Sequence, residues 1–285
     1  MCANNADATL LATQNTVATA WQWSTAGTGT FDTPTALGAT YTPSAADTAA
    51  GSAVLNISTT AQGTCLSVNQ SMTLSITDAP FIDAGIGQTV CANNANTTLL
   101  ATSVNTVATG FQWSTSGTGT FDTPNALGVV YDPSDADTAG APTAFITLNV
   151  STTAQGTCLS VNDDVIISIT DAPTVDAGAG STVCADSPVA TLAGSSTNAG
   201  GVTWSLSGAS DGTFSLATDP AATYTAGDAD TTAGFAILTL TTTGSGSCAE
   251  VAANVTITVN PGIYVEAGPA QSVCGNNALV VLAGN

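Results

Sequence analysis

The sequence contains no lysine, no arginine and no histidine among its 285 residues. Without histidine there is no Ser-His-Asp triad, no Cys-His pair and no imidazole ligand for a metal ion. Without lysine there is no Schiff base and no P-loop lysine, and without arginine there is no guanidinium clamp for a phosphate group. These absences exclude most catalytic mechanisms, and we expect the protein not to be an enzyme.

Positive side-chain charge is therefore missing, whereas 20 Asp and Glu residues give a formal net charge of -20. Such a surface repels a phosphate backbone and cannot release its counterions, so nucleic acid is excluded as a partner. No apolar run reaches the roughly 18 residues that a membrane span requires, and we expect no membrane insertion in this segment. The residues after Met1 lack the pattern of a secretion signal, so we expect any such signal to lie outside this sequence, in a longer chain.

What the sequence does contain is compatible with a folded protein. Hydrophobic residues make up 44% of the chain and charged residues only 7%. Disordered segments have the opposite balance, with low hydrophobicity and high charge. The chain can therefore bury a sizeable core.

A short motif that begins with cysteine recurs at intervals of about 90 residues, at Cys2, Cys91, Cys184 and Cys274. This period is too long for a solenoid repeat and matches a whole small domain, the size of an immunoglobulin-like sandwich. The first module lacks the segment that precedes the cysteine in later modules. The expected modules are residues 1–79 without a first strand, 80–172, 173–262, and the start of a fourth at 263–285.

Apolar and polar residues alternate in each module, as in Met72, Leu74 and Ile76 or Val255, Ile257 and Val259. This period of two is typical of strands that bury one face and expose the other, and no segment shows a convincing helical period. The sequence therefore predicts an all-β chain of tandem immunoglobulin-like sandwich modules in an extended rod.

A tryptophan occupies the same position in each module, at Trp23, Trp113 and Trp204. A bulky residue on one strand face is typical of the core between two packed sheets, and we expect these tryptophans to be buried there. The alternative is that exposed aromatic residues stack on carbohydrate, with Trp21, Phe111 and Tyr264 as candidates.

Two cysteines occur in each complete module, one before the first long strand and one in the turn before the last strand. The favoured pattern joins the two within each module: Cys2 with Cys65, Cys91 with Cys158, and Cys184 with Cys248. The alternative joins neighbours along the chain: Cys65 with Cys91, Cys158 with Cys184, and Cys248 with Cys274. We favour the first because a module gains stability from closing its own loop, on the order of 4 kcal/mol. Either pattern implies an oxidising, extracytoplasmic compartment.

Acidic residues flank the expected junctions between modules, at Asp78 and Asp83 and again at Asp171 and Asp176. Carboxylate oxygens are the ligands that calcium prefers, so calcium at these junctions is one hypothesis. The alternative is that these are ordinary turn residues on a solvated hinge, because no dense Asp-x-Asp-x-Asp loop is present. No other cofactor is required.

With these motifs placed, the chain resembles the PKD-like or immunoglobulin-like repeats of giant Bacteroidota surface proteins, including gliding-motility adhesins. The resemblance depends on Asp176-Ala177-Gly178 leading to Val183-Cys184, on the Trp-Ser-x-x-Gly-Thr-Gly-Thr-Phe block that starts at Trp23, and on the turn cysteine Cys65. It implies secretion, a long filament and adhesion, and it supplies no catalytic residue. Bacteroidota attach O-glycans at Asp-Ser/Thr patterns, which makes Thr48, Thr138 and Thr231 candidate glycosylation sites.

These observations favour a structural repeat segment of a secreted or cell-surface adhesin or extracellular filament, acting as an acidic disulfide-stapled stalk. Its partners would be neighbouring modules or subunits of the same filament, and glycans or other surfaces. One alternative is a set of calcium-dependent carbohydrate-binding modules. Another is a filament subunit that polymerises by strand donation, with residues 263–285 completing the first module of the next subunit. A glycosidase with a carboxylate pair such as Asp163 and Asp164 is disfavoured, because adjacent strand residues point to opposite faces.

Overall fold

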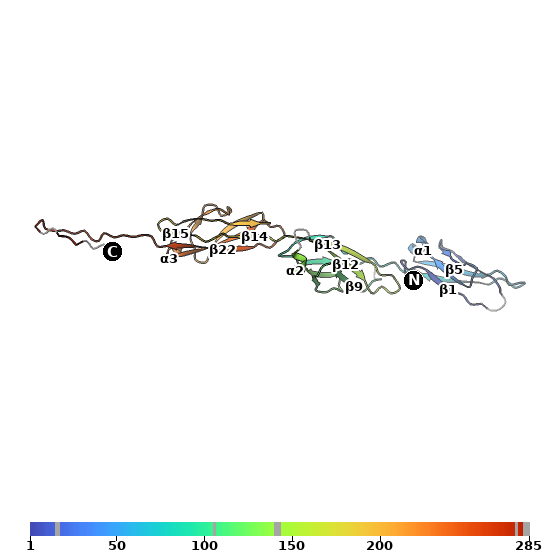
Figure 1. Cartoon of the computed structure of the whole chain (residues 1–285). Helices are drawn as coiled ribbons and strands as arrows, with labels where there is room; N and C mark the ends of the chain where they lie inside the picture. The colour runs from blue at the N-terminus through green and yellow to red at the C-terminus, as the bar shows by residue number, and fades with distance from the viewer. Residues whose placement is uncertain (15–17, 105–106, 140–143, 277–278, 282–285) are drawn as a thin grey trace. The chain divides into compact units, whose positions relative to one another are not determined.

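The computed structural model describes residues 1–14, 18–104, 107–139, 144–276 and 279–281 (Figure 1). These residues form two compact units: Met1–Val90 with Ala95–Thr170, and Cys91–Asn94 with Asp171–Asn285. Strands dominate both, and the helices of the described part are α1 (Ala45–Ala50), α2 (Asp135–Thr138) and α3 (Asp228–Ala233). None of them is long and apolar enough to cross a membrane.

The first repeat consists of two three-stranded antiparallel sheets. One has the order β1-β4-β3 and the other the order β2-β5-β6. Their strands are β1 (Ala8–Leu11), β4 (Gly38–Thr42), β3 (Thr30–Phe31), β2 (Trp21–Thr25), β5 (Ser52–Thr59) and β6 (Asn69–Ser75).

The second repeat has the same arrangement with one more strand. Its sheets have the orders β10-β11-β8 and β7-β13-β12-β9. Their strands are β10 (Thr120–Phe121), β11 (Gly128–Asp132), β8 (Thr97–Leu100), β7 (Gln88–Cys91), β13 (Asn162–Thr170), β12 (Ala144–Thr152) and β9 (Phe111–Thr115).

The third repeat adds a two-stranded sheet, β14-β17, to sheets of orders β16-β20-β19 and β15-β22-β21-β18. The strands are β14 (Thr174–Asp176), β17 (Ser195–Thr197), β16 (Val189–Thr191), β20 (Thr223–Thr225), β19 (Thr213–Phe214), β15 (Thr182–Cys184), β22 (Ala252–Asn260), β21 (Phe235–Thr243) and β18 (Gly201–Ser207). The all-β fold of sandwich modules is confirmed, and the exact module boundaries remain predictions.

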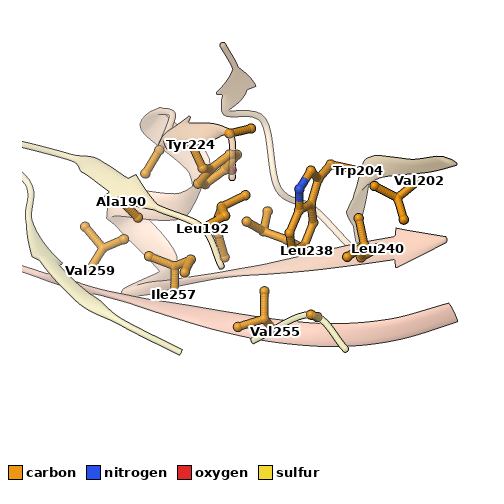
Figure 2. Packing of buried hydrophobic residues seen from close by; sticks show 14 residues of the cluster. Ala190, Leu192, Val202, Trp204, Tyr224, Leu238, Leu240, Val255, Ile257 and Val259 are labelled. Carbon is orange, nitrogen blue, oxygen red and sulfur yellow. The ribbon is translucent and has the colours of Figure 1, made fainter. Parts of the chain in front are cut away.

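Alternating apolar residues of facing strands build the core of the third repeat (Figure 2). Leu238 and Leu240 of β21 and Ile257 of β22 are buried against Leu192 and Tyr224, which come from the other layer. Removing this apolar surface from water is the main favourable contribution to folding, at roughly 25 cal/mol per Å².

The tryptophans lie in the core as expected. Trp204 is 2% exposed and its ring centroid lies 6.2 Å from that of Phe214, which in turn lies 5.2 Å from that of Tyr224. Trp23 and Trp113 are buried in the same way in the first two repeats. Aromatic pairs at these spacings add to the stabilisation from buried area alone.

The first and third repeats also bury a carboxylate, Asp47 and Asp230, which the sequence did not lead us to expect. The hydroxyl of Tyr41 donates to Asp47 Oδ2 at 2.8 Å, and the backbone N–H groups of Ser44 and Thr28 donate to the same carboxylate at 3.0 and 3.2 Å. Asp47 is the third residue of α1, and with the N-cap Ser44 it forms a capping box. The donors compensate the cost of burying the charge.

Hydrogen bonding sets the ionisation of this carboxylate. The backbone N–H of Ser44 is the main cause that lowers the pKa of Asp47 from its ordinary 3.8 to about 2, against the opposing effect of burial. Burial and the neighbouring Asp47 raise the pKa of Tyr41. The pairs Tyr131–Asp137 and Tyr224–Asp230 repeat the contact in the other two repeats.

We predict that Asp47→Asn destabilises the first repeat by about 1–3 kcal/mol at pH 7, because buried donors lose a charged acceptor. The folded pKa lies below the unfolded one, so the stabilisation is complete above about pH 4 and is lost as the pH falls toward 2. Thermal unfolding followed by tryptophan fluorescence should show a lower midpoint at pH 7 and a flatter pH profile below pH 4. The exposed carboxylate of Asp132 provides the control, and an equal effect of Asp132→Asn would contradict the prediction.

Candidate functional site

Two disulfides join successive repeats. Cys2 bonds to Cys158, and Cys91 bonds to Cys248, each with Cα atoms 4.9 Å apart. The sequence separations are 156 and 157 residues. In both, the first cysteine of one repeat pairs with the turn cysteine of the next repeat. We call each disulfide with its surrounding contacts a clamp.

Both pairing patterns expected from the sequence are therefore wrong. Cys65, Cys184 and Cys274 are unpaired and exposed. The reason is geometric: the backbone of Cys2 bridges to Thr77 at one end of β6, whereas Cys65 precedes the other end. Seven strand residues at about 3.3 Å each separate those ends by roughly 23 Å. A disulfide needs Cα atoms within about 7 Å, so the two cysteines of one repeat cannot meet.

Asparagine side chains hold the first clamp on both sides of the disulfide. Asn4 Nδ2 donates to the carbonyl of Leu159 at 3.0 Å, and the N–H of Leu159 donates back to Asn4 Oδ1 at 3.1 Å. Asn5 Nδ2 donates to the carbonyl of Thr157 at 3.3 Å. Asn4 thus pairs with the backbone beside Cys158 as a strand would, which fixes the approach of the two sulfur atoms.

The second clamp reproduces these contacts. Asn93 Nδ2 donates to the carbonyl of Ala249 at 3.0 Å and Asn93 Oδ1 accepts from the N–H of Ala249 at 3.2 Å. Asn94 Nδ2 donates to the carbonyl of Ser247 at 3.4 Å. The recurrence of the Cys-Ala-Asn-Asn motif was visible in the sequence, but its role as a clamp was not, because each partner lies more than 150 residues away.

The junction acids have backbone and turn roles. The carbonyl oxygen of Asp78 lies 3.6 Å from Cys2 Sγ and 3.8 Å from Cys158 Sγ, and the carbonyl of Asp171 lies at 3.5 and 3.7 Å from the sulfurs of the second clamp. Asp83 and Asp176 accept from the N–H two residues later, at 2.8 and 2.9 Å. Within the described ranges no group of three or more Asp, Glu, Cys or His residues could hold a metal ion. Calcium at these junctions therefore remains a prediction from the sequence alone.

The candidate glycosylation threonines lie on the short helices. Each hydroxyl donates to a carbonyl three residues earlier, at 2.8 Å for Thr48, 3.2 Å for Thr138 and 3.0 Å for Thr231. The aspartate before each threonine occupies the third helical position and accepts from the buried tyrosine. This contact explains why the aspartate recurs, and glycan attachment at the threonine stays a prediction.

The disfavoured catalytic pair is occupied by structural contacts. Asp163 Oδ2 accepts from the N–H of Ala84 at 2.9 Å, and Asp164 Oδ1 accepts from Asn149 Nδ2 at 2.7 Å. Of the aromatic residues considered for carbohydrate, Tyr264 is exposed and donates its hydroxyl to Glu266 at 2.8 Å. Trp21 and Phe111 are half-buried. The three come from different repeats and none of these contacts assembles a carbohydrate site.

No family model and no curated protein matches the chain. Among solved structures, domains EC1–3 of mouse protocadherin-24 are 14% identical, with 89% of this chain and 93% of that chain covered and a TM-score of 0.39. The titin I-band fragment I67–I69 is 10% identical, with 84% and 87% covered and a TM-score of 0.40. Sidekick-1 immunoglobulin domains 1–4 are 13% identical, with 91% and 73% covered and a TM-score of 0.30. At these values the similarity carries no conclusion about function.

We predict that Asn4→Ala opens the first clamp locally. The N–H of Leu159 loses its acceptor, Asn4 Oδ1, so its hydrogen exchange should accelerate about five- to tenfold, which corresponds to the roughly 1 kcal/mol of one hydrogen bond. Hydrogen–deuterium exchange with residue-level mass spectrometry measures this rate. Asn276→Ala is the matched control, because Asn276 has the same repeat position and is exposed. Unchanged Leu159 exchange in Asn4→Ala would show that the side chain does not hold the clamp.

Proposed function

We propose that the chain is a load-bearing repeat segment of a secreted or cell-surface adhesin or extracellular filament, in which it forms an acidic, disulfide-stapled stalk. The observation that carries the proposal is the pair of clamps, which join successive repeats through the same disulfide and asparagine contacts. A binding or catalytic role needs no such repetition. A structure that transmits tension through many repeats does.

The two disulfide loops overlap in the sequence. The first encloses residues 2 to 158 and the second encloses residues 91 to 248. The shortest covalent path from residue 2 to residue 248 crosses both disulfides and only the 67 residues between 91 and 158. Tension between residues 2 and 248 therefore passes through both disulfides and this 67-residue segment, even when a repeat unfolds.

The composition fits an exposed extracellular segment. Disulfides form and persist in oxidising environments. The net charge of -20, without any basic side chain, keeps the surfaces of separate copies apart in solution. A trypsin-like protease has no Lys or Arg to recognise. We propose a mechanical role and no catalysis, and carbohydrate binding remains a prediction from the sequence.

We predict that the length of the chain under force distinguishes this disulfide pairing from pairing within each repeat. In the oxidised protein, the fully extended distance from residue 2 to residue 248 should be about 230 Å, since 67 residues span at most about 3.3–3.6 Å each. After reduction the 246 intervening residues should extend to about 850 Å. Single-molecule force spectroscopy with handles attached next to residue 2 and next to residue 248 measures both values.

Two cysteine variants serve as controls for the stretching experiment. Cys158→Ser leaves only the second disulfide, so the shortest path becomes the 89 residues from 2 to 91 and the extension rises to about 300 Å. Cys65→Ser should leave the extension at about 230 Å, because Cys65 is unpaired. A longer extension in Cys65→Ser would indicate pairing within the repeat and would contradict the proposed stalk.

A further inference from the structure

The third repeat contains a cavity that lies between the loop 207–210, helix α3 and strand β21. Its volume is about 270 Å³. Apart from the loop, its lining consists of the apolar residues Ala229, Ala233, Phe235 and Ile237 and of one charged residue, Asp230. Phe235 is 47% exposed, so the cavity opens to solvent at this side chain. The cavity therefore combines an apolar wall with a single carboxylate.

The loop over this cavity is longer than its equivalents in the other repeats. The core tryptophan precedes the next phenylalanine by eight residues in the first two repeats, and by ten residues from Trp204 to Phe214. In the first repeat the shorter loop reaches the buried aspartate, because the N–H of Thr28 donates to Asp47 Oδ1 at 3.2 Å. The second repeat has the same contact at 2.9 Å. Both oxygens of the aspartate thus have donors in these two repeats.

The longer loop of the third repeat leaves one oxygen of Asp230 without such a donor. Asp230 is 1% exposed, and its Oδ2 accepts from the hydroxyl of Tyr224 and from the N–H of Gly227. Within the described part of the chain, no hydrogen bond reaches its Oδ1. A buried carboxylate is stabilised by each donor that it gains, so Oδ1 is an acceptor for a group that enters the cavity.

Asp211 supplies a second carboxylate beside the cavity. It has the repeat position of Thr28, and its two carboxylate oxygens accept from the N–H of Ala229, each at 3.1 Å. In the first repeat Ser44 caps the helix, whereas the equivalent residue here is Gly227. A Cβ atom on residue 227 would lie 2.2 Å from Asp211 Oδ1, so only glycine leaves room for this carboxylate. The cap of α3 is therefore Asp211, and two carboxylates lie at one end of the helix.

The electrostatic potential at this end of α3 is negative. Burial raises the pKa of Tyr224, and so do its hydrogen bond to Asp230 and the charges of Asp230 and Asp211. The chain has no Lys, Arg or His, so none of its own side chains can neutralise these carboxylates. A cation that enters the cavity from outside would do so.

The composition of the cavity selects the kind of cation. Calcium takes about six to eight oxygen ligands, and within the described ranges no group of three or more Asp, Glu, Cys or His residues could hold a metal ion. The apolar wall instead gains stability when hydrocarbon covers it. A primary ammonium group on an alkyl stem offers three N–H donors and an apolar stem. The donors suit Asp230 Oδ1, and the stem suits the wall.

We propose that the cavity of the third repeat binds a lysine side chain of a partner protein. The ammonium group donates to Asp230 Oδ1, in place of the backbone N–H that serves Asp47 in the first repeat. The alkyl stem lies against Ala233, Phe235 and Ile237. Asp211 adds to the attraction without a direct contact, because its oxygens already accept from the backbone of α3.

The lysine comes from a different protein, because this chain and any second copy of it contain none. Opposite charge favours such a partner, since a net charge of -20 attracts a basic surface. The long stem of lysine lets its ammonium group enter a cavity while the backbone of the partner stays outside. All residues that form the site belong to the third repeat, so the inference does not depend on the load-bearing role of the clamps.

Methyl NMR spectroscopy of the oxidised full-length chain tests the binding. The probe is Nα-acetyl-lysine N-methylamide, added at constant ionic strength because salt screens the ion pair. We expect saturable shifts of the methyl signals of Ala229, Ala233 and Ile237. Nα-acetyl-norleucine N-methylamide has the same four-carbon stem without the ammonium group. It should bind at least fivefold more weakly, because its side chain has no donor for Asp230.

Two variants of the third repeat locate the binding site. Ala233→Leu should weaken binding of the lysine probe at least tenfold, because the larger side chain occupies the space of the stem. Ala50→Leu is the matched control, since Ala50 has the same position in α1 of the first repeat. Asp230→Asn should reduce the affinity for the lysine probe to that for the norleucine probe.

Trp204 fluorescence during thermal unfolding reports whether each variant of the third repeat is folded. If Asp230→Asn unfolds the repeat, Ala233→Leu decides the proposal, because it leaves the contacts of Asp230 in place. The absence of saturable shifts, equal affinity for the two probes, or an Ala233→Leu variant that binds like the wild type would overturn the proposal.

Discussion

The covalent clamp between consecutive repeats is the constraint on which the rest of the structure depends. A sandwich of about 90 residues can bury its own core, but its ends are free to move against a neighbour. The disulfides from Cys2 and Cys91 tie each repeat covalently to the next, and the paired hydrogen bonds of Asn4 and Asn93 lie beside them. The first cysteine of the repeat has to lie at the junction for this bond to form.

A second constraint comes from the lack of any basic side chain. No carboxylate can be neutralised by an ion pair with a side chain, so buried acids must rely on N–H and O–H donors. Asp47 is satisfied by backbone amides and the hydroxyl of Tyr41, and the same solution recurs at Asp137 and Asp230. The first and third repeats thus bury the helix-capping carboxylate among neutral donors, and these donors lower the pKa of Asp47 to about 2.

Much of the fold could be predicted from local patterns. Alternation in segments such as Val255–Val259 revealed the strands, and the position of Trp204 revealed the core. Helix α1 was missed because six residues are too few to show a helical period. The cysteine pairing was wrong for another reason: loop entropy depends on sequence distance, whereas Cys2 and Cys65 are kept apart by the length of β6. The clamp asparagines could be seen as a repeated motif, but only the fold brings Leu159 and Ala249 to them.

The overlapping disulfide loops have a consequence for damage. A single cut in the backbone anywhere between residues 3 and 247 leaves both fragments joined by at least one sulfur bridge. A cut between residues 92 and 157 leaves them joined by two. If a protease hydrolyses one peptide bond between residues 3 and 247, the chain therefore stays in one piece. Two separate cuts in this range are needed before a fragment is released.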